Sequence, residues 1–244
     1  SVVLELSAIQ TGVRLVPLSV ALLASALAVP RLWPKASPRR VARIGLLLLL
    51  AATVLLIALL DADATASIVT VPLLIMGLGV GALASQLGAV TVSAVPDKES
   101  SEVGGLQNTA LNLGASLGTA LVGSVLISVL STMVLQGVLT SPSIPESLKA
   151  DAQTTFGAGV PFVSDTAVRS SLQAYGATEA TIQEVLQINA DARLVALRTA
   201  LFVVVLAAAL ALFFTRRLPS EPPGGQEVIP DYREMSDEQE QPIY

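Results

Sequence analysis

The sequence predicts an all-α membrane protein, because it is strongly apolar, poor in charge and divided into long uncharged runs. Of its 244 residues, 52% are hydrophobic and only 14% are charged, and the mean hydropathy is +0.70. Soluble domains carry a charge on about a quarter of their residues. A hydrocarbon core about 30 Å thick needs about 20 apolar residues per helix, and five runs in this chain approach or exceed that length.

The five predicted spans lie between charged or turn-forming residues and are rich in Leu, Ala and Val. They cover residues 11–30, 44–60, 68–95, 103–135 and 194–215. The third and fourth spans are long enough to tilt or to extend beyond the bilayer. The short apolar piece at residues 2–6 is typical of the end of a further span. We therefore expect a transmembrane helical bundle over residues 1–217, with five complete spans and the end of a sixth.

The positions of the basic residues predict the orientation of these spans, because Lys and Arg are retained on the cytoplasmic side of a membrane. Residues 61–67, between the second and third spans, contain none. The segment after the first span holds five basic residues and the last span ends in two more: Arg31, Lys35, Arg39, Arg40, Arg43, Arg216 and Arg217. We therefore expect a multi-pass protein of the cell membrane, with residues 136–191 external and the C-terminus in the cytoplasm.

The predicted external loop, residues 136–191, is long for a connection between two helices. Pro and Gly residues interrupt its first part. From Thr178 to Asn189 apolar residues recur at helical spacing, and Thr181 and Glu184 have the spacing of an N-terminal capping box. We expect a short surface helix that leads into the last span.

The acidic character of the protein is confined to its C-terminal tail. The formal net charge is −5, but residues 218–244 carry −6 and the first 217 residues carry +1. The tail is rich in Pro, Gly, Glu and Gln and cannot bury enough apolar area to fold. We expect residues 218–244 to be a disordered cytoplasmic tail, and we expect no nucleic-acid partner.

The chain contains no histidine and no cysteine. It therefore lacks the residues that form disulfides, thiolate nucleophiles, Ser-His pairs and the usual zinc, haem and iron–sulfur sites. Ser and Thr are present, but no His or buried Lys accompanies them as a base. We predict a protein that is not an enzyme, has no catalytic residues and no metal site, and needs no cofactor.

The third predicted span separates small residues from polar residues around its axis. Gly77 and Gly81 lie on a ridge of small residues, which lets a second helix approach closely. Gln86 lies on the opposite face. It either hydrogen-bonds a neighbouring helix or lines a substrate cavity, and the sequence leaves both possibilities open.

The fourth predicted span repeats this arrangement. Gly114 and Gly118 form a ridge for helix packing, whereas Asn108, Asn112 and Thr119 cluster on another face. An amide without a partner costs several kcal/mol in hydrocarbon, so we expect the asparagines to face the bundle or a water-filled cavity and not lipid. The sequence favours neither of two roles for these asparagines, contact with a substrate or hydrogen bonding between helices.

The few ionisable residues inside or next to the spans lie near the predicted outer ends. They are Glu5, Arg14 and Arg198. Long basic side chains in such positions reach the interface with water, which explains the two arginines without a functional role. A role in substrate binding or gating is the alternative, and Glu5 is a possible partner of Arg14.

Three stretches carry a resemblance to a known family. Residues 7–17 look like an outer loop that runs into a span containing a Gly and a Pro. Residues 30–40 are similar to a basic loop motif, with Lys35, Arg39 and Arg40 at matching positions. Residues 96–118 look like an acidic internal loop followed by Gly, Asn and a Gly-rich ridge. Together they resemble the C-terminal portion of a major facilitator superfamily transporter, most closely its 14-span drug:proton antiporter (multidrug efflux) branch.

This resemblance implies the C-terminal helical bundle of a secondary active transporter, which expels small amphipathic molecules or drugs by alternating access in exchange for protons. The implied partners are the lipid bilayer, the missing N-terminal half of the transporter and a small-molecule substrate. We expect Gln86, Asn108, Asn112 and Thr119 to line the substrate cavity, and the chain alone to be inactive. A non-transporting scaffold, which recruits a cytoplasmic partner through its acidic tail, is the alternative, and deletion of residues 219–244 would distinguish the two.

Overall fold

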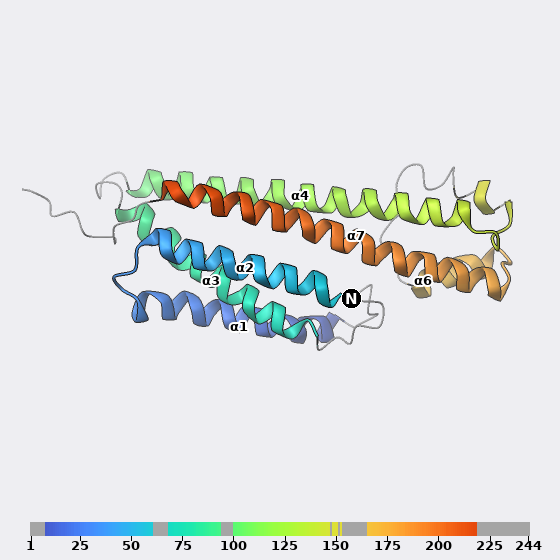
Figure 1. Ribbon diagram of the computed structural model, residues 1–244, viewed down its shortest axis with the longest axis horizontal. Coiled ribbons are helices and arrows are strands. Elements are labelled where there is room, and N and C mark those ends of the chain that lie inside the picture. Colours follow the sequence, from blue (N-terminus) through green and yellow to red (C-terminus); the bar gives the residue numbers. More distant parts are fainter. Residues whose placement is uncertain are drawn as a thin grey trace, which may run out of the picture.

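The computed structural model describes residues 8–60, 68–93, 100–146, 148–150, 152 and 165–218. Its elements are α1 (Ala8–Leu32), α2 (Pro38–Leu59), α3 (Thr70–Ser93), α4 (Ser100–Thr140), α6 (Asp165–Ala174), α7 (Glu179–Phe214) and the short 3₁₀ helix η1 (Thr215–Arg217) (Figure 1). No strand occurs within these ranges, so the predicted all-α fold class is confirmed. The predictions for residues 2–6, for residues 61–67, for Glu5 and for the tail beyond Leu218 lie outside the described residues.

Four helices are long and apolar enough to cross a membrane: Ile9–Leu32, Pro38–Leu59, Glu102–Thr140 and Glu179–Arg217. Residues Thr70–Gln86 of α3 form a shorter apolar helix. These five segments overlap the five predicted spans. The chain is thus a multi-pass membrane protein.

Two of these helices extend well into the predicted external loop. Helix α4 continues to Thr140, and α7 begins at Glu179 and not near residue 194. With 36 residues and a rise of 1.5 Å per residue, α7 is about 54 Å long, which exceeds the hydrocarbon core by more than 20 Å. The surface helix expected before the last span is therefore the first part of the same continuous helix.

The start of α7 differs from the predicted capping box. Thr178 is the N-cap, and its hydroxyl oxygen accepts a hydrogen bond from the backbone N–H of Thr181 at 3.3 Å. Glu184 is used elsewhere, because its carboxylate accepts a hydrogen bond from the hydroxyl of Ser141 at 2.9 Å. The capping motif therefore begins three residues earlier than the sequence pattern suggests, and Glu184 joins the end of α4 to α7.

Helix α3 packs between α1 and α2, and glycines allow both close contacts. A Cβ atom added to Gly77 would lie 2.9 Å from the Cβ of Ala21 in α1, and one added to Gly81 would lie 2.8 Å from the Cβ of Ser25. Both distances are shorter than real Cβ contacts. On the other side of α3, a Cβ on Gly79 would lie 2.7 Å from the carbonyl oxygen of Gly45 in α2.

Helices α4 and α7 form a second pair, which runs beyond the ends of α1, α2 and α3 (Figure 1). The buried core of this pair includes Leu130, Val134 and Val138 of α4 and Ala192 and Ala196 of α7. Helix α6 packs against α7 in the part that extends furthest. The apolar core of this pair therefore lies at the end of the predicted fourth span, where the predicted external segment begins.

An ion pair between a buried arginine and a partly exposed aspartate holds α6 against α7, and no sequence pattern predicted it. Arg193 is only 2% exposed, and its guanidinium donates to the carboxylate of Asp165 at the start of α6. The side-chain amide of Asn189 donates to the same oxygen at 3.2 Å. A buried charge is tolerated when it is paired and hydrogen-bonded, and this arrangement provides both for Arg193.

Candidate functional site

The first half of α4 is exposed around almost its whole circumference. Every residue from Asn108 to Leu121 is exposed, and Leu106 and Leu117 retain 71% and 70% of their accessible surface. Packing against α7 becomes extensive only further along, where Leu130 is buried. In a helix apolar enough to cross a membrane, this segment presents a long surface that no described residue covers.

The polar residues singled out on α4 lie on this exposed segment. The side-chain amide of Asn112 donates to the backbone carbonyl of Asn108 at 3.0 Å, and the hydroxyl of Ser116 donates to the carbonyl of Asn112 at 2.8 Å. Thr119 lies two turns beyond Asn112 and is also exposed. Some polar side chains of this segment therefore donate hydrogen bonds to the backbone of α4 itself. Asn108, Asn112 and Thr119 nevertheless remain accessible from outside the chain.

Gln86 occupies a different environment on α3. It is half-buried, and its side-chain amide donates to the hydroxyl of Ser85 at 3.3 Å. In the part of the chain that the structure describes, no hydrogen bond joins it to Asn108, Asn112 or Thr119. The four predicted cavity residues are thus divided between a packed helix and an exposed one.

The two glycine ridges also differ. Gly77 and Gly81 face α1 at distances that exclude any side chain, and the hydroxyl of Ser25 donates to the carbonyl of Leu78 across this contact at 2.8 Å. Gly114 and Gly118 have no atom within 4 Å of the position that a Cβ would occupy, apart from their own helix. Helix packing at Gly114 and Gly118 stays a prediction, and it requires a surface beyond the described residues.

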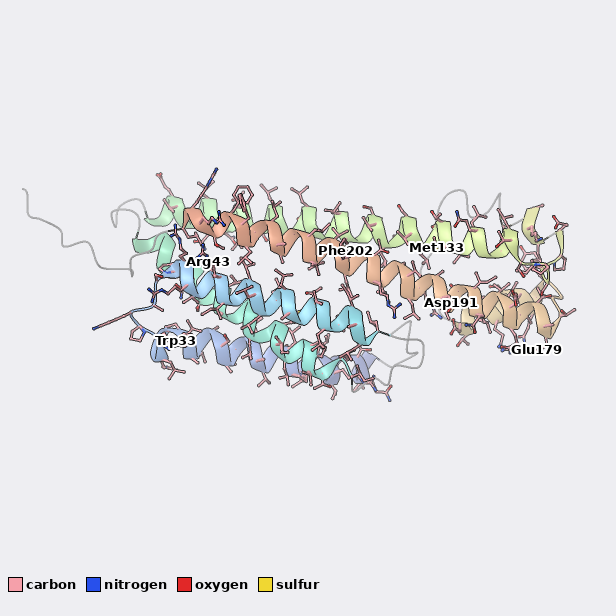
Figure 2. All side chains as sticks on the ribbon, viewed as in Figure 1. Trp33, Arg43, Met133, Glu179, Asp191 and Phe202 are labelled. Carbon is pink, nitrogen blue, oxygen red and sulfur yellow. The ribbon has the colours of Figure 1, made fainter. Side chains whose placement is uncertain are left out.

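The basic loop contains residues with two different roles. The guanidinium of Arg39 donates to the carbonyl of Arg216, and the Nε of Arg43 donates to the hydroxyl of Thr215 at 3.1 Å. These contacts join the first turns of α2 to the end of α7, where unpaired carbonyls and the helix dipole attract cations. Lys35 and Arg40 are exposed and line a pocket between α1 and α2. Figure 2 shows Arg43 and Trp33 at the same end of the molecule, far from Glu179.

The two arginines near the predicted outer ends have different surroundings. Arg198 of α7 donates to the carbonyl of Leu60, the residue that follows α2. This contact ties α7 to the end of α2 and gives Arg198 a role that the sequence interpretation did not include. Arg14 of α1 has one buried guanidinium nitrogen without a hydrogen-bond partner among the described residues.

The described residues contain no group of three His, Cys, Asp or Glu side chains that could hold a metal ion. The candidate site is the exposed segment of α4, which carries both polar and apolar side chains.

Part of the chain is similar to a known protein family. The family model described as Major Facilitator Superfamily matches residues 1–119. This range includes α1, α2, α3 and the exposed segment of α4 as far as Thr119. No curated protein and no solved structure matches the chain. The match shows that just under half of the chain is similar to this superfamily, and it fits the all-helical fold.

Proposed function

We propose that this chain forms one helical bundle of a secondary active transporter that expels small amphipathic molecules or drugs in exchange for protons. The observation that carries the proposal is the exposed first half of α4, which presents Asn108, Asn112 and Thr119 on an apolar helix of membrane length. Amides that face hydrocarbon without partners cost several kcal/mol, so this surface faces a water-filled cavity or a second bundle. Alternating access by two bundles around a central binding site provides both.

The second bundle in this proposal is the N-terminal half of the same transporter. It covers the open glycines Gly114 and Gly118 and closes the cavity over Asn108 and Asn112. The basic end that contains Lys35, Arg39 and Arg40 lies in the cytoplasm of a cell-membrane protein, and the far ends of α4 and α7 lie outside.

Proton coupling requires an acidic side chain within the membrane that can bind the proton. The predicted spans of this bundle do not supply one. Residues 11–30, 44–60, 68–95, 103–135 and 194–215 contain no Asp or Glu. Ionisable residues within membranes carry protons in pumps and transporters. We therefore assign proton binding to the second bundle, and substrate contact in this bundle to Gln86, Asn108, Asn112 and Thr119.

A transport assay tests the function. The 244-residue chain and the longest open reading frame that contains it are each reconstituted in proteoliposomes with an imposed proton gradient. Uptake of ethidium and the pH of the lumen are followed by fluorescence. We expect exchange with the longer protein and none with the chain alone. Transport by the chain alone, or transport that ignores the proton gradient, would contradict the proposal.

Substitution in the longer protein tests the site. Replacing both Asn108 and Asn112 with Ala should reduce efflux at unchanged protein level, because the cavity loses two amides. The matched control is Thr132→Ala, which removes a hydroxyl bonded only to its own helix at Ser128. Unchanged efflux in the double variant would refute the cavity role. A fall in protein level alone would indicate that the amides join helices.

A further inference from the structure

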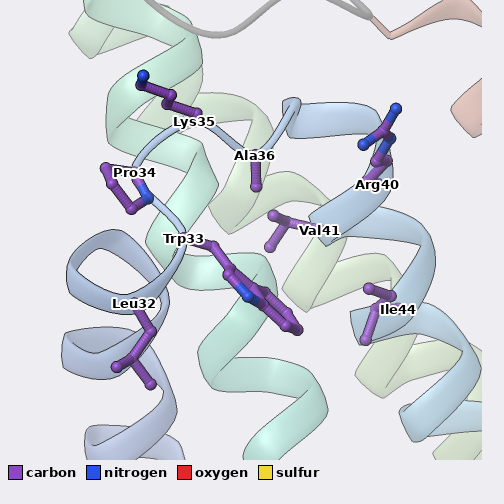
Figure 3. Close-up of a pocket in the computed structure, with 8 residues that line it drawn as sticks. All are labelled: Leu32, Trp33, Pro34, Lys35, Ala36, Arg40, Val41 and Ile44. Atoms are coloured by element: carbon purple, nitrogen blue, oxygen red, sulfur yellow. The ribbon is translucent and has the colours of Figure 1, made fainter.

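An open pocket of about 480 Å³ lies at the basic end of the bundle, between the end of α1 and the start of α2. Its walls are mainly apolar and include Leu32, Trp33, Val41 and Ile44. Lys35 and Arg40 also line the pocket, and Figure 3 shows them on opposite sides of the indole of Trp33, with their charged ends pointing away from it. The pocket thus combines an apolar interior with two cations at its mouth.

The two cationic side chains that line the pocket form no ion pair within the described part of the chain. Lys35 and Arg40 are exposed, and no acidic partner of either occurs among the described residues. Their neighbours Arg39 and Arg43 are in contrast bonded to the end of α7. The basic loop therefore divides into a pair that holds two helices together and a pair that faces outward over the pocket.

The lengths of α1 and α2 also indicate where the pocket lies relative to a bilayer. Helices α1 and α2 are both long enough to cross a membrane, and α1 ends at Leu32 while α2 begins at Pro38. The lengths of the two helices place the residues between them at the boundary between hydrocarbon and lipid headgroups when both helices span a bilayer. Trp33 is 58% exposed there, and Trp is enriched at this boundary because its ring is apolar and its N–H is polar.

We propose that this pocket binds an anionic phospholipid. The positive charges of Lys35 and Arg40 attract the phosphate to the mouth of the pocket, and the upper part of an acyl chain lies against Leu32, Trp33 and Ile44. Arg and Lys both bind phosphate, and a cation near an anionic membrane surface contributes about fivefold in affinity. The apolar walls favour a lipid over a soluble phosphate, because a free phosphate would leave them exposed to water.

Native mass spectrometry of the 244-residue chain, titrated with phosphatidylglycerol or phosphatidylcholine in detergent, tests this site. We expect phosphatidylglycerol to bind more tightly, and the double variant K35Q/R40Q to lose roughly 25-fold in affinity. The matched control is R31Q/R217Q, which removes the same charge from the same end but outside the pocket. Equal losses in the two double variants would overturn the proposal, because they would indicate a diffuse charge effect.

Two further measurements separate the lipid from its headgroup and from misfolding. Trp33→Ala should weaken phosphatidylglycerol binding several-fold, and glycerol phosphate alone should bind far more weakly than the lipid. Tight binding of glycerol phosphate, or unchanged lipid binding in W33A, would refute an acyl-chain site. The variant K35R/R40K keeps both charges and should retain lipid binding; loss of binding in this variant would contradict a role for the charges.

Discussion

Gly77→Val should destabilise the bundle, because it forces apart the contact between α3 and α1. A Cβ at this position would lie 2.9 Å from the Cβ of Ala21, whereas ordinary contacts lie at 3.4–4 Å. The carbonyl oxygen of Leu18 would lie closer still, so the helices must separate by about 1 Å or more. A gap of about 1 Å removes up to half of the dispersion energy of the atoms that line it. Overpacking of this kind costs about 1–3 kcal/mol. The hydrogen bond from Ser25 to Leu78 crosses the same contact and is lengthened as well.

The matched control is Gly118→Val, because a Cβ at Gly118 meets no atom within 4 Å. Both substitutions change helix propensity by the same amount, so the difference between them reports packing alone. Unfolding in mixed SDS and mild detergent, followed by the fluorescence of Trp33, the only tryptophan, measures this difference. We expect Gly77→Val to be about 2 kcal/mol less stable than Gly118→Val. Equal stability would refute the close contact between α1 and α3.

Three further substitutions test the contacts that join the helices. Asp165→Asn leaves the buried guanidinium of Arg193 without its counter-charge and should cost about 1–3 kcal/mol, because Asp165 itself is partly exposed; amide hydrogen exchange should increase first in α6. Arg39→Gln removes a charged hydrogen bond to the end of α7 and should cost about 1–2 kcal/mol in the same unfolding assay, whereas Arg40→Gln should change stability little. Thr178→Ala removes the N-cap of α7 and should cost about 1 kcal/mol, with faster exchange confined to the first turn of that helix.

For each of these substitutions, one result would contradict the expected contact. Unchanged exchange in α6 would indicate that its position does not depend on the Asp165 carboxylate. Equal effects of the Arg39 and Arg40 substitutions would indicate general charge loss and not a specific contact. Faster exchange along the whole of α7 after the Thr178 substitution would show that its far end is held by the cap and not by packing on α4.

The helices were predictable because long uncharged runs leave few alternatives in a chain of this composition. Their ends were harder to predict. Helix α7 begins at Glu179 because Thr178 caps it, while the sequence pattern favoured Thr181, a residue of the same type three positions later. A hydropathy boundary marks where lipid contact should end, and a helix that packs on a neighbour continues past that boundary.

The side-chain contacts depend on tertiary proximity that one sequence does not contain. Arg39 and Arg216 are 177 positions apart. The sequence therefore used each residue only as a separate indication of membrane orientation and did not indicate the contact between them. Arg193 stood at the predicted edge of a span, and its pairing with Asp165 depends on where α6 folds back. The spacing of Gly77 and Gly81 did place them on one ridge, but only the structure identifies α1 as the neighbour.

Because α4 and α7 are continuous helices, the part of this pair that extends beyond α1, α2 and α3 must tilt together with the rest of the pair. The first 15 residues of α7, up to Arg193, extend for about 22 Å and are braced by α4 and α6. A tilt of this pair by about 10° at the membrane surface would move its tip by roughly 4 Å. A spectroscopic label on the exposed Gln183 would therefore report helix motion inside the bilayer from a position in water.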